Sequence, residues 1–94
     1  MKVLSWSPSF RRAYQKYIQR HPNESERIEQ TLLKLVEDPF MQSLDTHKLK
    51  GVLTGLWACS VAYDCRIVFQ FLSPPGSDED IILLVDIGSH DEVY

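Results

Sequence analysis

A change in the spacing of apolar residues near position 56 constrains the fold of this chain more than any other feature. Before it, apolar side chains recur every three to four residues, as they do on one face of a helix. After it, Trp57, Cys59 and Val61 alternate with smaller side chains, and this spacing of two is typical of strands. We therefore expect an α+β fold with helices in the first half of the chain and most strands in the second.

Two helices are predicted in the first half. Ser7 is suited to cap the first, because Pro8 then occupies a helical position where a missing N–H has no cost. Its apolar face comprises Phe10, Ala13, Tyr14, Tyr17 and Ile18. His21-Pro22 should end this helix, Asn23 should cap the second, and Asp38-Pro39 should stop it. The short connection predicts an antiparallel helical hairpin.

The remaining segments predict the strands. Residues 2–6 form a first strand, and residues 57–62, 66–72 and 80–87 form an antiparallel meander of three. The last is the most continuously apolar and should lie inside the sheet, while residues 48–50 could add a further strand. The first strand must rejoin the sheet after the helices. We expect a single domain over residues 1–94 in which the helical hairpin packs on the sheet.

Composition narrows the classes of protein. The 94 residues contain no apolar run near the roughly 20 residues that cross a bilayer, and the first residues lack the pattern of a secretory signal. We therefore expect a cytoplasmic protein without a membrane segment. Two cysteines cannot build a disulfide framework, and the sequence lacks Cys/His metal spacings, so we expect no cofactor or metal. The net charge of −3 is uneven: residues 1–50 carry +3 and residues 51–94 carry −6.

A polar set remains once core and surface positions are explained. Its members lie at or just before predicted strand ends: His47, Lys48, Lys50, Asp64, Arg66, His90, Asp91 and Tyr94. Histidine exchanges protons near neutral pH, Lys and Arg hold a phosphodiester, and a tyrosine ring can stack on a nucleobase. Together these groups suit metal-free RNA cleavage. Taken singly, each also has a structural explanation, such as a charged edge strand for the two lysines.

Four stretches resemble one family: His47–Gly51, Gly55–Trp57, Asp64–Phe69 and Ile87–Tyr94. They are similar to the RelE/ParE superfamily of bacterial toxins, and most of all to its YafQ-type mRNA interferases. The resemblance implies a RelE-like fold over the whole chain, and a toxin of a type II toxin–antitoxin system. Such a toxin cuts mRNA on the ribosome and is neutralised by a partner antitoxin.

The resemblance also implies roles for individual residues. His47, Asp64 and His90 match catalytic positions, Arg66 matches an arginine that holds the scissile phosphate, and Tyr94 matches a functional aromatic. We predict that His90 is the general acid and that either Asp64 or His47 accepts the 2′-OH proton. Lys48 and Lys50 should help Arg66 to stabilise the phosphate, and Tyr94 should position a base. We expect these side chains to gather in one pocket once the sheet forms.

Two alternatives stay open from the sequence. Some YafQ-type relatives have a further catalytic histidine where this chain has Ser60, and the net charge is acidic. A catalytically degenerate relative that only binds its antitoxin would fit both features. A ParE-like inhibitor of DNA gyrase would share the scaffold and would not need His47 or His90.

Overall fold

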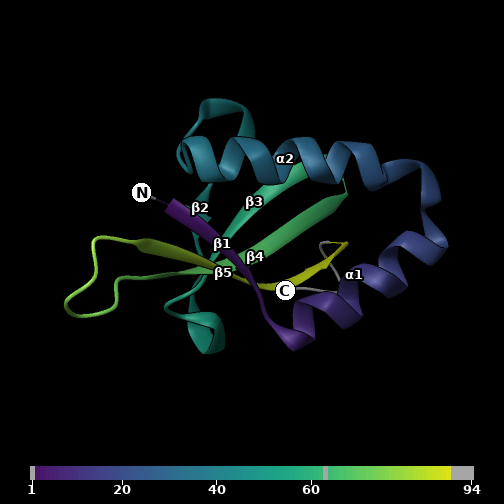
Figure 1. Cartoon of the computed structure of the whole chain (residues 1–94). Helices are drawn as coiled ribbons and strands as arrows, with labels where there is room; N and C mark the ends of the chain where they lie inside the picture. Colours follow the sequence, from purple (N-terminus) through teal and green to yellow (C-terminus); the bar gives the residue numbers. More distant parts are fainter. Residues whose placement is uncertain (1, 63, 90–94) are drawn as a thin grey trace.

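A five-stranded sheet carrying two helices makes up the computed structural model, which describes residues 2–62 and 64–89 (Figure 1). The elements in chain order are β1 (Lys2–Trp6), α1 (Pro8–Arg20), the 3₁₀ turn η1 (Pro22–Glu24), α2 (Ser25–Glu37), η2 (Gln42–Leu44), β2 (His47–Lys48), η3 (Gly51–Leu53), β3 (Trp57–Ala62), β4 (Cys65–Leu72) and β5 (Asp80–Gly88). The predicted α+β class and the order of strand, two helices and meander are confirmed.

The strands lie in the order β1-β5-β4-β3-β2. β1 pairs with β5 in parallel, and every other neighbouring pair is antiparallel. The first strand therefore does rejoin the sheet, and β5 lies inside it between β1 and β4, as its apolar sequence predicts. The further strand expected near 48–50 exists as β2, a two-residue edge strand over His47–Lys48.

The helices begin and end largely where their sequence signals predict. Ser7 caps α1: its Oγ accepts a hydrogen bond from the Phe10 N–H at 3.1 Å. The prediction that Asn23 caps the second helix is wrong. Pro22, whose ring fixes φ near the helical value, already starts the 3₁₀ turn, so Asn23 lies inside that turn and α2 begins at Ser25. The two helices pack on different strands. The chain reverses at η1, so that α1 packs on β5 and α2 lies over β3 and β1 (Figure 1).

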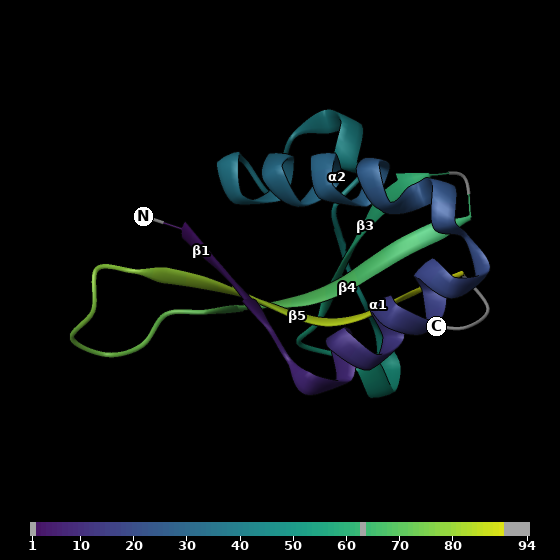
Figure 2. The same cartoon turned by 45° about the vertical axis from the view of Figure 1, so that its right-hand side comes forward.

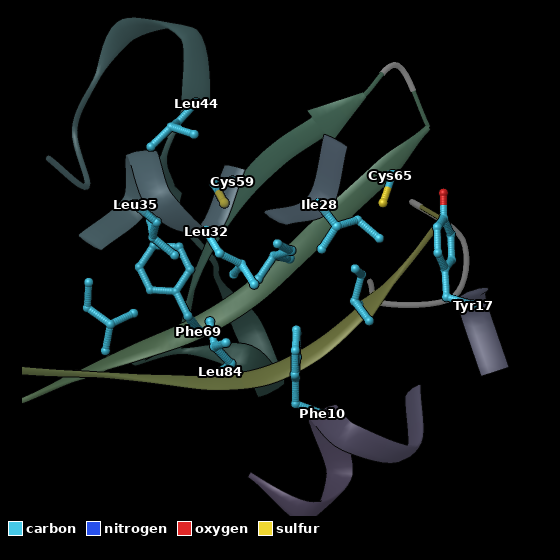
Figure 3. Close-up of a cluster of buried hydrophobic side chains, with 13 residues drawn as sticks. Phe10, Tyr17, Ile28, Leu32, Leu35, Leu44, Cys59, Cys65, Phe69 and Leu84 are labelled. Atoms are coloured by element: carbon cyan, nitrogen blue, oxygen red, sulfur yellow. The ribbon is translucent and has the colours of Figure 1, made fainter. Parts of the chain in front are cut away.

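One core joins both helices to the sheet (Figure 3). Phe10 from α1 and Ile28 and Leu35 from α2 are fully buried against the row of sheet residues that faces them, which includes Phe69 and Leu84. Burying each such side chain contributes about 1.5–3 kcal/mol, so this cluster fixes the positions of both helices on the sheet.

The loop between β2 and β3 forms a compact turn on the other side of the sheet. It contains η3 and lies opposite α2 in both views (Figures 1 and 2). Gly51 and Gly55 adopt φ values of +70° and +98°, a conformation that residues with a Cβ rarely take. The Leu49 N–H bonds to the Leu56 carbonyl at 3.0 Å and closes the turn. The two glycines of this stretch are therefore required by the shape of the loop.

A candidate active-site cleft at the β3–β4 turn

The predicted site residues lie on three elements. His47 and Lys48 form β2, Lys50 follows it, Asp64 lies at the turn between β3 and β4, and Arg66 is the second residue of β4. His47, Lys48, Lys50 and Asp64 are exposed, whereas Arg66 is half-buried. The predictions for His90 and Tyr94 fall outside the described residues. Ser89, the residue before His90, is described and is half-buried.

Strand register assigns these side chains to faces of the sheet. Residues opposite each other on antiparallel strands project from the same face. Cys59 pairs with Ile67, and both belong to the core under the helices, so the helices cover that face. Ala58, which pairs with His47, and Ser60, which pairs with Arg66, belong to the other face. His47 and Arg66 therefore both start from the face that the helices do not cover.

Arg66 reaches back toward the turn that precedes its strand. Its Nη1 donates a hydrogen bond to the Ala62 carbonyl oxygen at 3.0 Å, and it lies 3.5 Å from the Cys65 carbonyl oxygen. The β3–β4 pairing is irregular between Ser60 and Ala62, where one additional residue brings Ala62 opposite Cys65. The bulge and the arginine together place a cationic head group at the same turn as the Asp64 carboxylate.

A cleft of about 330 Å³ opens where this turn faces the junction of α1 and α2. Asp64 and Cys65 line it from the sheet, with Ala62 and Ser89 beside them. Tyr17, His21, Glu24 and Arg27 line it from the helices. The cleft therefore brings a sequence-predicted residue, Asp64, together with side chains from a distant part of the chain and with the residue that precedes His90.

Tyr17 and Cys65 line the cleft side by side. The two side chains lie at the end of the core (Figure 3), close enough for each to shift the pKa of the other. Burial is the main cause that raises the pKa of both groups, and the Glu24 carboxylate raises both further. Glu24 Oε2 is buried and lies 3.6 Å from the Arg27 guanidinium. Tyr17 and Cys65 therefore stay neutral at physiological pH. The charged side chains of Glu24 and Arg27 line the same cleft.

His47 is distant from this cleft. It pairs with Ala58, four residues before the end of β3, and β2 lies on the far side of β3 from β4. A strand rise of about 3.4 Å per residue and a strand spacing of about 4.8 Å put its Cα about 15 Å from the turn. His47 Nδ1 is 2.9 Å from the Asp45 carbonyl oxygen, which orients its ring on β2. Among the described residues, Asp64 and Arg66 share a turn, and His47 stands apart from them.

Sequence reasoning missed the helix side of the cleft. The sequence predicts His21 only as part of the end of the first helix, and it indicates no place in the site for Glu24 and Arg27. Their proximity to Asp64 depends on how α1 and α2 pack on the sheet, and no local spacing encodes that packing.

In the part of the chain that the structure describes, no group of three or more His, Cys, Asp or Glu side chains is arranged to hold a metal ion.

Comparison with protein families identifies the class of protein to which this chain belongs. The family of YafQ, a bacterial toxin of type II toxin–antitoxin systems, matches residues 2–94. The chain belongs to the YafQ toxin family. The resemblance to RelE/ParE toxins close to YafQ is thereby confirmed.

Solved structures share the fold. YafQ from E. coli strain BL21(DE3) is 14% identical, with a TM-score of 0.77 over 100% of this chain and 99% of that one. A YoeB/ParE toxin from Agrobacterium tumefaciens is 21% identical, with a TM-score of 0.75 over 96% and 99%. The E. coli DinJ–YafQ toxin–antitoxin complex contains a chain that is 15% identical, with a TM-score of 0.74 over 99% and 97%.

No curated protein matches the sequence. Within residues 2–62 and 64–89, neither helix has the length and apolar character that spanning a bilayer requires.

Proposed function

We propose that this toxin is an endoribonuclease that cuts mRNA on the ribosome. The observation that supports this most is the β3–β4 turn, where Asp64 lines a cleft and the Arg66 guanidinium is bonded to the carbonyl oxygen of Ala62. Ser89 borders the same cleft, and the chain continues from it to His90. A carboxylate, a guanidinium and an imidazole can supply the proton transfer and the charge stabilisation that phosphodiester cleavage without a metal needs.

The chemistry is an internal attack by the ribose. A general base takes the proton of the 2′-OH, and the 2′-oxygen forms a bond to phosphorus. The bond from phosphorus to the 5′-oxygen breaks, and a general acid gives that oxygen its proton. The products are a 2′,3′-cyclic phosphate and a 5′-hydroxyl. Arg66 stabilises the charge that develops on the phosphate oxygens, because a guanidinium binds two of them at once.

The remaining residues take the roles that the sequence suggests. His90 is the general acid, and either Asp64 or His47 is the base. Lys48 and Lys50 lie exposed on and after β2, where they can neutralise phosphates of the bound strand. The Lys48 ammonium is 5.4 Å from the centre of the Trp57 ring, which restricts where this cation points. Tyr94 positions a base by stacking.

Purified ribosomes programmed with a defined mRNA test the proposal. The wild-type toxin should cut the message within the ribosome, and His90→Ala and Asp64→Asn should each lower the single-turnover rate at least 100-fold while unfolding at the same urea concentration as wild type. Lys34→Gln, an exposed change on α2, serves as the matched control and should cut normally. Wild-type protein that cuts nothing but induces the SOS response in cells would instead identify a gyrase inhibitor.

We also propose that a cognate antitoxin binds the outer face of α1. This helix carries four exposed cations and no acidic residue. Arg12, Lys16 and Arg20 recur at every fourth residue, so they form a row about 6 Å apart along the helix. An acidic segment of a partner could pair with this row. The complex of E. coli YafQ with DinJ supports an antitoxin partner for this fold.

The small protein encoded beside the toxin gene is the partner to test. Arg12→Gln, Lys16→Gln and Arg20→Gln combined should weaken its affinity at least tenfold and reduce the dependence of the affinity on salt. Lys34→Gln should change neither. Unchanged affinity for the triple variant would place the antitoxin elsewhere on the toxin.

A further inference from the structure

His21 is a histidine that the proposed function leaves unused. It is exposed and lines the same cleft as Asp64 and Ser89. Of the two histidines in the described part of the chain, it is the one that lines this cleft; His47 lies on β2, about 15 Å from the turn that holds Asp64. A proton acceptor must come within hydrogen-bonding reach of the 2′-OH, so position favours His21 over His47.

The backbone holds His21 firmly at the helix junction. Its N–H donates to the Tyr17 carbonyl at 2.9 Å, and its own carbonyl accepts the Glu24 N–H at 3.0 Å. The residue thereby ends α1 and begins η1 at once. Because both backbone groups are bonded, the start of the side chain is fixed relative to the sheet.

A ring contact holds the imidazole as well. The centre of the His21 ring is 4.5 Å from the centre of the Tyr17 ring, and the two planes are inclined by 32°. Tyr17 is buried in the core that joins both helices to the sheet, so it is a rigid support. A catalytic group supported in this way loses little freedom when substrate binds.

We propose that His21 is the general base of the cleavage reaction, with Asp64 stabilising the imidazolium that forms when the ring accepts the 2′-OH proton. This rests on the proposed endoribonuclease function, and His21 replaces both Asp64 and His47 as the base in it. The 2′-oxygen then attacks phosphorus, the bond to the 5′-oxygen breaks, and His90 protonates the leaving oxygen. The other titratable or charged groups that face the cleft are Tyr17, Glu24, Arg27 and Cys65; Tyr17 and Cys65 are neutral.

Chemical rescue tests the assignment. His21→Ala should lower the single-turnover cleavage rate about 10²- to 10⁴-fold, the usual contribution of a general base. Free imidazole in the buffer should raise the cleavage rate of this variant at least tenfold. A merely structural role for His21 would not give this result. Gln19→Ala, an exposed change on the same helix, is the matched control and should cut at the wild-type rate with or without imidazole.

Two outcomes would overturn the assignment. One is full activity of His21→Ala under conditions where His90→Ala is inactive, which would leave the endoribonuclease function standing and remove only the role of His21. The other is a loss of activity in His21→Ala that imidazole does not restore although the variant stays folded. Failure of the proposed function is distinguishable from both, because the wild-type protein itself would then cut no mRNA.

Discussion

Arg66 and Ala62 are joined across the β3–β4 turn: the guanidinium of the first donates to the carbonyl oxygen of the second at 3.0 Å. The bond ties the start of β4 to the end of β3 at the point where the pairing of the two strands is irregular. It also holds the guanidinium at the turn that contains Asp64. One donor of the guanidinium is used in this bond, and the planar group carries other donors that can face a phosphate.

Replacement of Arg66 by lysine tests whether this geometry matters beyond charge. Arg66→Lys keeps the positive charge but loses the planar fork, so the cleavage rate on ribosomes should fall at least tenfold. The midpoint of urea unfolding should move little, because the change removes one partly exposed hydrogen bond of about 1 kcal/mol. Lys34→Arg is the matched control on α2. Cleavage by Arg66→Lys at the wild-type rate would show that charge alone suffices.

The cap of α1 offers a prediction about stability. Ser7 Oγ accepts the Phe10 N–H at 3.1 Å, and Phe10 is the fully buried anchor of this helix. Ser7→Ala should lower the free energy of unfolding by about 1 kcal/mol, because the N–H loses its acceptor. Urea denaturation followed by circular dichroism measures this. Ser43→Ala, at an exposed serine of η2, should stay within about 0.5 kcal/mol of wild type.

This cap also shows how much of the fold local signals encode. The Ser7-Pro8 pair specifies the start of α1, and the spacing of two from Trp57 onward specifies β3. The parallel pairing of β1 with β5 follows only from topology, since the two strands are more than 70 residues apart in sequence. The bulges at Val61 in β3 and Val85 in β5 could not be predicted. A bulge depends on how neighbouring strands meet in three dimensions.

One part of the candidate site was predictable from the sequence, and another part was not. Residue chemistry and family resemblance point to Asp64 and Arg66, which do lie at one turn. His21 carries no such signal: next to Pro22 it is typical of a helix end, and that is also where it lies. Only the packing of the helix junction against the sheet brings it to Asp64's cleft. The sequence thus indicates the sheet side of the cleft and omits the helix side.

Alkaline pH should destabilise the protein through Cys59. Burial raises the pKa of this thiol from 9.0 to about 12, so the folded state favours the neutral form. The resulting stability is fully present below about pH 9 and is lost as the pH rises toward 12, at up to about 1.4 kcal/mol per pH unit. Urea midpoints measured from pH 8 to pH 10.5 should fall, since Tyr17 and Cys65 contribute in the same direction.

Cys59→Ala isolates the contribution of this thiol. The variant should be less stable at pH 8, because it leaves space in the core, but its stability should fall less steeply above pH 9. Equal slopes for the variant and the wild type would show that Cys59 does not titrate differently in the folded and unfolded states. The comparison of slopes does not depend on the stability that each protein has at neutral pH.

Mapping transcript ends by primer extension after induction in cells tests most directly whether this YafQ-family toxin cuts mRNA. Wild-type toxin should produce new 5′ ends inside coding regions that are being translated, and these ends should disappear with Asp64→Asn or when the start codon of the mapped message is removed. Growth arrest with intact transcripts would contradict the claim.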